Sequence, residues 1–142
     1  MKASYPFVED GYDRGGSKLP DVPILWVEVE TPSERFRGPC LVDTGFDGAV
    51  YANEDLALLL EGSSPIRKDY LYTVGEHEIE CEVFGSKGYL IAPETARRVT
   101  GLASMDILVP TRVHELSREV IVGRRILNTL VIRLNGKTLD VL

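Results

Sequence analysis

The stretch Cys40–Gly48 has the sequence Cys-Leu-Val-Asp-Thr-Gly-Phe-Asp-Gly. The apolar residues before Asp43 are typical of the end of a buried strand, so Asp43 comes where that strand leaves the core. The two glycines, Gly45 and Gly48, permit a tight turn and the close approach of another backbone, because glycine has no Cβ. A carboxylate here costs desolvation energy unless a partner satisfies it or a reaction uses it. Asp43 is therefore either a turn aspartate that binds its own loop, the commoner role of such a residue, or a catalytic acid.

The motif Val42-Asp43-Thr44-Gly45 resembles the active-site motif of aspartic proteases, in which apolar residues precede Asp, then Thr or Ser, then Gly. Later in the chain, Val120-Ile121-Val122-Gly123-Arg124 resembles the apolar-apolar-Gly-Arg segment of the retropepsin-like single-domain proteases. About eighty residues lie between Asp43 and Gly123, which is room for a flap hairpin and further strands. From about Ile24 to Leu142 the chain is thus similar to a retropepsin-like protease, of the bacterial and archaeal type in which Phe46 follows the motif.

This resemblance implies the fold and the assembly. The fold would be mostly β, a closed retropepsin-like barrel half with one or two short helices, and two copies would form a twofold homodimer. Hydrolysis by this mechanism needs two carboxylates about 3 Å apart that share one proton. Because the chain holds one Asp-Thr-Gly, Asp43 would pair with Asp43 of a second copy across the twofold axis. In retropepsins the end strands interleave at that interface, which gives Lys137–Leu142 a possible place there.

The resemblance also implies roles for the motif residues. Asp43, Thr44 and Gly45 would be the catalytic residues of an aspartic endopeptidase, with the Thr44 hydroxyl bonded across the dimer axis and the Gly45 backbone against the substrate. The alternative is a non-catalytic dimeric module that binds a peptide or protein in the same cleft. Phe46 departs from the small residue usual in retropepsins and would shape a specificity pocket or narrow the cleft. Asp47 would bind the substrate backbone. A further implied contact is an Asp47–Arg124 ion pair, for which the alternative is two unrelated surface charges.

A hairpin over residues 70–84 is predicted by period two, because apolar residues alternate with glutamates from Glu78 to Val83. The segment 74–77 is a plausible turn between its strands. The resemblance implies that this hairpin is the flap, which closes over bound peptide and excludes water. Its turn residues would contact the substrate: Val74, Gly75 and Glu76. An ordinary hairpin is the alternative.

Composition indicates one ordinary globular domain. The chain has 142 residues, of which 44% are hydrophobic and 27% charged. A net charge of −6 argues against a nucleic-acid surface, and no apolar run is long enough to span a membrane. Cys40 and Cys81 lie in strand-like apolar patterns, so we expect buried free thiols. Together with the absence of a visible signal peptide, they favour a cytoplasmic location.

The remaining segments complete the expected architecture. Residues 1–20 are rich in Gly, Asp and Ser and are predicted to be a flexible arm, part of which can dock as a strand; residues 21–142 would form the protease domain. Asn53 is a good N-cap for a short leucine-rich helix. Residues 93–100 would be a short helix or an inserted loop. Asn135-Gly136 predicts a hairpin with a type I′ turn.

No cofactor or metal is expected. His77 and His114 lack a third ligand at metal spacing, so two surface histidines are the expected interpretation. Cys40 has no histidine in its motif, which argues against a thiol nucleophile.

Overall fold

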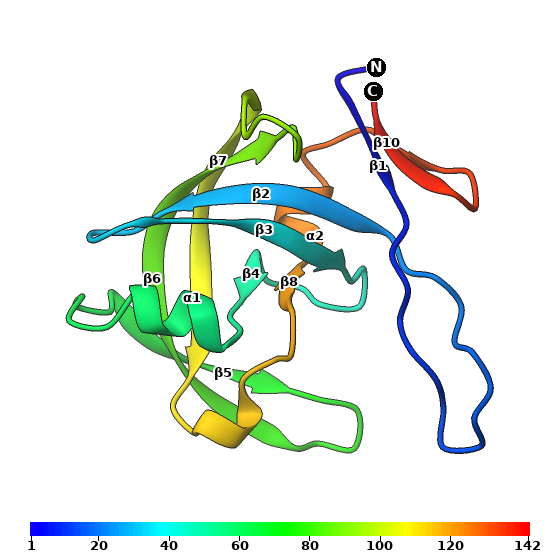
Figure 1. Cartoon of the computed structure of the whole chain (residues 1–142). Helices are drawn as coiled ribbons and strands as arrows, with labels where there is room; N and C mark the ends of the chain where they lie inside the picture. Colours follow the sequence, from blue (N-terminus) through cyan, green and yellow to red (C-terminus); the bar gives the residue numbers. More distant parts are fainter.

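The computed structural model describes the backbone of residues 1–142 and the side chains of all but residues 103 and 104. Strands dominate the described chain, joined by two short α-helices and one 3₁₀ turn (Figure 1). In chain order the elements are β1 (Ala3–Pro6), β2 (Ile24–Glu30), β3 (Arg35–Val42), β4 (Val50–Tyr51), α1 (Glu54–Leu59), β5 (Arg67–Tyr72), β6 (Glu78–Ile91), β7 (Arg98–Pro110), η1 (Val113–Glu115), β8 (Val120–Val122), α2 (Arg124–Leu127), β9 (Ile132–Leu134) and β10 (Thr138–Val141).

Most strands form a closed barrel. The sheet runs in the order β2-β3-β8-β4-β7-β6, and β6 pairs back onto β2, which closes the ring. β5 pairs with β6 alone and so lies outside the ring. The mostly β, closed barrel with two short helices that the sequence predicted is therefore confirmed.

Local sequence signals account for several elements. β2 and β3 form an antiparallel hairpin, in which Ile24 lies opposite Leu41, and β3 ends at Val42, directly before Asp43, as predicted. The side chain of Asn53 accepts a hydrogen bond from the Leu56 N–H at 3.0 Å and so caps α1, as predicted. Leu56 is fully buried beneath this helix, against the barrel core. No helix in the described residues is both long and apolar enough to cross a bilayer.

β6 is longer than the sequence predicted. The strand runs unbroken to Ile91, whereas the predicted hairpin ends at residue 84. A Cβ at Gly88 would come within 2.2 Å of the Met105 side chain and 3.2 Å of the Glu28 carbonyl oxygen. Glycine is present because the strands approach closely, whereas in a sequence pattern it resembles a break. Residues 93–97 form a tight turn closed by Ala92 N–H and the Arg97 carbonyl oxygen at 2.9 Å, so no helix forms there.

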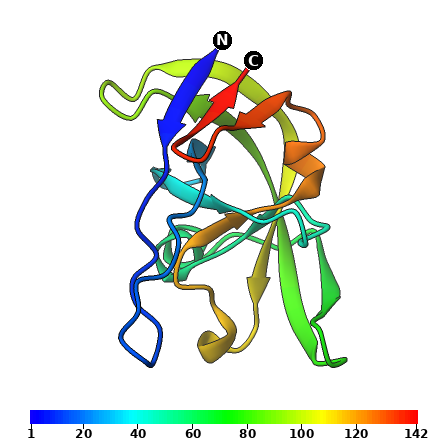
Figure 2. The same cartoon turned by 90° about the vertical axis from the view of Figure 1, so that its right-hand side faces the viewer.

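A second sheet holds both ends of the chain in the order β1-β10-β9 (Figure 2). The hairpin predicted at Asn135-Gly136 forms, but its turn type was wrong. Only Gly136 has a positive φ, of 88°, because the Asn135 side chain accepts hydrogen bonds from the N–H groups of Lys137 and Thr138 instead. This side-chain turn replaces the type I′ geometry.

Part of the predicted N-terminal arm lies on this sheet. β1 pairs with β10, and Tyr5 is 1% exposed, with its hydroxyl donating to the Ile91 carbonyl oxygen at 3.0 Å. Beyond β1 the chain runs out and back as a long loop bridged at Val8–Val22 and Tyr12–Lys18 (Figures 1 and 2). The domain boundary at residue 20 stays a prediction.

Candidate functional site

The Asp-Thr-Gly motif lies in the loop between β3 and β4, where the barrel positions it. β3 and β8 run parallel, and the Asp43 N–H donates to the Val122 carbonyl oxygen at 3.0 Å. One carboxylate oxygen of Asp43 accepts a hydrogen bond from the Gly45 N–H at 2.9 Å. The side chain is nevertheless exposed. Asp43 thus binds its own loop and also presents a carboxylate to solvent, so the two interpretations of the residue are compatible.

The start of α2 packs against this loop through backbone groups. Arg124 N–H donates to the Phe46 carbonyl oxygen at 2.9 Å, and Arg125 N–H donates to that of Gly48 at 3.2 Å. Gly123 makes this approach possible, because a Cβ there would lie 2.4 Å from the Gly48 oxygen and 2.6 Å from the Phe46 oxygen. The two motifs that the sequence singled out are therefore in contact.

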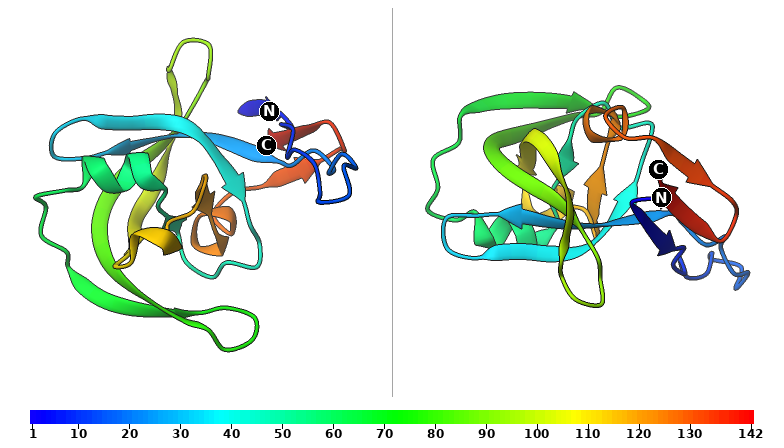
Figure 3. Two further views of the ribbon diagram at one scale, coloured as in Figure 1. Left: turned by 60° about the horizontal axis from the view of Figure 1, so that its bottom comes forward. Right: turned by 90° about the horizontal axis from the view of Figure 1, so that it is seen from above.

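A cavity of about 680 Å³ lies between this loop and the hairpin formed by β5 and β6. In Figure 3 the tip of the hairpin extends from the barrel on the same side as the loop that follows β3. Several of the predicted site residues line the cavity: Asp43, Gly45, Phe46, Asp47, Val74 and Arg124. Three others, Thr44, Gly75 and Glu76, are exposed and are not among the residues that line it in the described structure.

Asp47 and Arg124 both face the cavity, but they do not form the predicted ion pair in this single chain. No salt bridge between them occurs among the described side chains. The side chains of Asp47 and Arg124 are both exposed. The two segments are joined by the hydrogen bond from Arg124 N–H to the Phe46 carbonyl oxygen, which involves neither side chain. The two segments are held together by backbone hydrogen bonds, which a sequence pattern does not reveal.

Several residues that line the cavity were not predicted as site residues. Tyr70 and Tyr72 line the cavity from β5, and their spacing of two was the available signal. Arg67 and Asp106 form a 2.7 Å ion pair at its wall, across a separation of 39 residues. No local pattern could have revealed that contact, because it depends on how β5, β6 and β7 pair.

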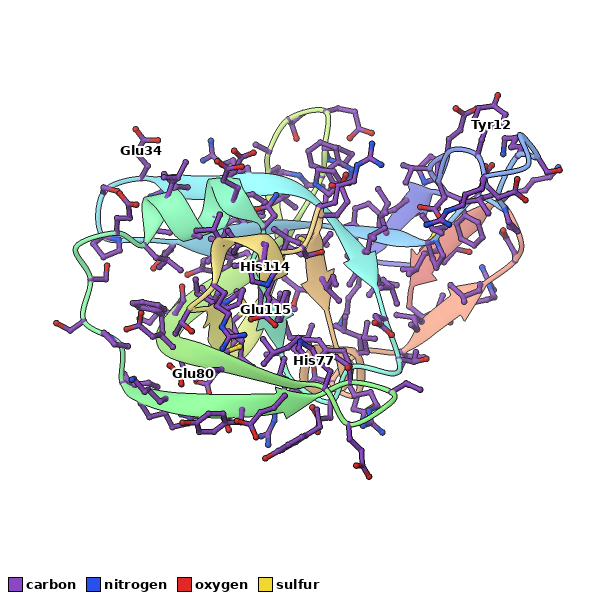
Figure 4. The ribbon with its side chains drawn as sticks, turned by 90° about the horizontal axis from the view of Figure 1, so that it is seen from below. Tyr12, Glu34, His77, Glu80, His114 and Glu115 are labelled. Atoms are coloured by element: carbon purple, nitrogen blue, oxygen red, sulfur yellow. The ribbon has the colours of Figure 1, made fainter. Side chains whose placement is uncertain are left out.

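The hairpin is tied to the barrel by a histidine at its turn. His77 Nε2 lies 3.0 Å from a carboxylate oxygen of Glu115, whose side chain is 7% exposed (Figure 4). The Glu115 carbonyl oxygen accepts a 2.6 Å hydrogen bond from the Tyr51 hydroxyl, and the Tyr51 ring packs edge-on against Phe46 at 6.2 Å. A chain of contacts thus links the hairpin turn to the residue after Asp-Thr-Gly. Sequence reasoning treated His77 as a surface histidine and missed this role.

The two cysteine thiols are not part of the candidate site. Cys40 and Cys81 are both free and buried, as predicted. Burial raises the pKa of both thiols, that of Cys81 to about 11. Neither is therefore a ready nucleophile. Among the described residues, no group of three histidine, cysteine or acidic side chains is arranged to hold a metal ion.

Comparisons with known proteins bear on the fold. No protein-family model matches the chain, and no curated protein matches its sequence. The structure is similar to a crystal structure described as a retropepsin-like aspartic protease from Rickettsia conorii, with a TM-score of 0.51 and 11% sequence identity. The likeness covers 99% of this chain and 98% of the other. At this identity it shows a shared retropepsin-like fold and nothing about the reaction.

Proposed function

We propose that this protein is an aspartic endopeptidase whose active site is shared between two identical chains. The observation that carries the proposal is the exposed Asp43 carboxylate, held at the wall of a 680 Å³ cavity beneath a hairpin, on a retropepsin-like barrel. One carboxylate cannot act as both base and acid in a single step. A second Asp43 across a twofold axis supplies the missing group.

The proposed reaction follows from the dyad. Two carboxyls about 3 Å apart share one proton, because both cannot be ionised at that distance. The ionised carboxylate removes a proton from water, whose oxygen attacks the peptide carbonyl carbon. The protonated carboxyl gives its proton to the carbonyl oxygen. The C–N bond then breaks as the leaving nitrogen takes up a proton, and a carboxylic acid and an amine result.

The surrounding residues would bind and enclose the substrate. Extended peptide would lie between the Gly45 backbone and the hairpin, with Phe46 and Asp47 at its sides. Tyr70 and Tyr72, which are 45% and 70% exposed, offer apolar surface from the hairpin. Closing the hairpin over the peptide would exclude water and strengthen the interactions of the dyad.

A non-catalytic dimeric peptide-binding module is the second candidate. The His77–Glu115 contact favours it, since a tied hairpin opens and closes less freely than a loose one. Against it stands the cost of placing two carboxylates face to face, which a pure binding module need not meet. A cytoplasmic location is part of the proposal, because the two cysteines remain free thiols.

The test is digestion of a mixed peptide library, read by mass spectrometry from mildly acidic to neutral pH. Wild type, Asp43→Asn and the matched control Asp55→Asn would be compared, since Asp55 is exposed on α1 and does not line the cavity. We expect wild type and Asp55→Asn to cleave, and Asp43→Asn to lose about 10²–10⁴-fold in rate, the usual contribution of a general acid or base.

Equal cleavage by wild type and Asp43→Asn would refute the proposal. If a folded, dimeric wild type cleaves nothing, the binding module becomes the better account.

A further inference from the structure

The strand expected at the dimer interface is not available for it. β10, which covers most of residues 137–142, lies in the middle of its sheet, with β1 on one side and β9 on the other. Both of its edges are already hydrogen-bonded. A partner strand can therefore join this sheet only at the outer edge of β1 or of β9.

The β1 edge is poorly suited to accept a strand. β1 is four residues long and includes Pro6, which has no N–H to donate. Proline at a sheet edge is a common device against edge-to-edge pairing. The Ser4 hydroxyl is also engaged, donating to a carboxylate oxygen of Asp140 at 2.7 Å.

The β9 edge, in contrast, presents free backbone groups. Leu142 N–H donates to the Val131 carbonyl oxygen, and Asn135 N–H donates to the Thr138 carbonyl oxygen. The backbone N–H and C=O groups of residues 131, 133 and 135 therefore point toward β10. Because neighbouring residues of a strand point their amides in opposite directions, those of Ile132 and Leu134 face outward. The described structure shows no strand paired there.

Apolar side chains surround this open edge. Val131 is 65% exposed, Leu134 54% and Leu142 43%, all within or beside the β9–β10 hairpin. Exposed apolar residues beside an unpaired strand edge favour association with another chain. Unlike the β1 edge, this one carries no proline.

A short stretch of chain connects this edge to the candidate site. α2 starts on the Asp-Thr-Gly loop through the Arg124–Phe46 hydrogen bond, and a four-residue helix rises only about 6 Å. β9 begins at Ile132, shortly after that helix ends. Figure 2 looks onto the face that carries both this sheet and the loop following β3.

We propose that a second copy of this chain docks along the outer edge of β9, with the two β9 strands antiparallel about the twofold axis. The two sheets then join into one, and the two Asp43 loops face each other across the same axis. This inference rests on the proposed function, because it is the shared dyad that requires the second copy.

The test is the substitution Leu134→Pro, which removes the outward N–H of residue 134 and leaves the hydrogen bonds between β9 and β10 in place. Leu134→Pro would be compared with wild type and with Leu134→Val, which keeps the N–H, by sedimentation velocity across the micromolar range. We expect Leu134→Pro to raise the dimer dissociation constant about tenfold or more, because twofold symmetry removes two hydrogen bonds at once. Leu134→Val is expected to dimerise like wild type.

A Leu134→Pro protein that dimerises like wild type overturns this interface, as does a wild type that stays monomeric. Circular dichroism would check the folding of each variant. If Leu134→Pro does not fold, Leu134→Lys places like charges at the same edge and is expected to weaken the dimer as well; an unchanged dimer then overturns the proposal.

Library digestion of the same samples separates the two proposals. If wild type cleaves and the Leu134→Pro variant still dimerises, the peptidase proposal stands and this interface is refuted. If Leu134→Pro weakens the dimer but wild type cleaves no peptide, the interface stands and the peptidase proposal is refuted.

Discussion

At the scale of single residues, Gly123 sets the geometry of the candidate site. It lets the start of α2 come within hydrogen-bond distance of the Asp-Thr-Gly loop, because no Cβ separates it from the Gly48 and Phe46 oxygens. A Cβ at this position would meet these two backbone oxygens and the Phe46 ring, so movement of a side chain alone cannot relieve the contact. The position of Asp43 therefore depends on a residue that takes no part in the proposed chemistry.

Gly123→Ala is expected to lower the free energy of unfolding by about 1–3 kcal/mol, the usual cost of overpacking a tight site. It should also reduce peptide cleavage, because the loop must shift to relieve the contact. Urea unfolding and library digestion would measure the two effects. Gly85→Ala is the matched control, since a Cβ there meets only Ile66, at 3.9 Å. Equal behaviour of the two variants would show that the loop and α2 are not closely coupled.

At the scale of elements, a buried carboxylate joins three strands of the barrel. Glu28 on β2 is 1% exposed and accepts hydrogen bonds from Arg37 on β3 at 2.8 Å and from Arg98 on β7 at 2.7 Å. Arg98 also stacks over the Tyr89 ring at 3.8 Å. Burial acts to raise the pKa of Glu28, but the hydrogen bonds from the two arginines outweigh it and lower the pKa below the ordinary 4.5.

This lowered pKa predicts a pH dependence of stability. The carboxylate stabilises the fold fully above its ordinary pKa of 4.5, and the stabilisation is lost as the pH falls through the lower, folded-state pKa. Glu28→Gln is therefore expected to lower the urea midpoint at neutral pH and to approach wild type in acid. The control is Glu30→Gln, on the same strand but with a 38% exposed side chain. A Glu28→Gln effect that does not shrink toward acid pH would contradict the argument.

At the scale of the whole molecule, the two ends of the chain meet beside the barrel (Figure 1). Tyr5 brings the N-terminal segment into the main core, where its hydroxyl binds the Ile91 carbonyl. Burial, with Glu94 nearby, raises the pKa of Tyr5 to about 12. The first strand thus packs as part of the folded unit, although the sequence around it is typical of a mobile arm.

Tyr5→Ala is expected to lower the free energy of unfolding by about 3–5 kcal/mol, as for other large aromatic side chains removed from a core. Tyr12→Ala, in the exposed loop beyond β1, should change it by no more than about 0.5 kcal/mol. Urea unfolding of both variants makes the comparison. A neutral Tyr5→Ala would mean that residues 1–20 behave as the flexible arm that the sequence predicted.

Local signals were enough to predict much of this protein. The Asn53 cap, the strand that ends before Asp43, the hairpin at Asn135-Gly136 and the alternation in β6 all reflect interactions between residues near one another in the chain. These contacts set backbone conformation directly, so residue type and spacing report them. The barrel fold and the position of the Asp-Thr-Gly loop follow from such signals together with the family resemblance.

Other features depend on how distant strands close around the core. Ser4 meets Asp140 across 136 residues, His77 meets Glu115 across 38, and the predicted Asp47–Arg124 ion pair is replaced by backbone contacts. Which side chains meet in this way is set by sheet order and register, and these follow from the burial of the whole core. A strand's own sequence shows which face is apolar. It does not show which strand lies beside it, and for that reason the middle position of β10 and the open edge of β9 emerge only when the complete chain is folded.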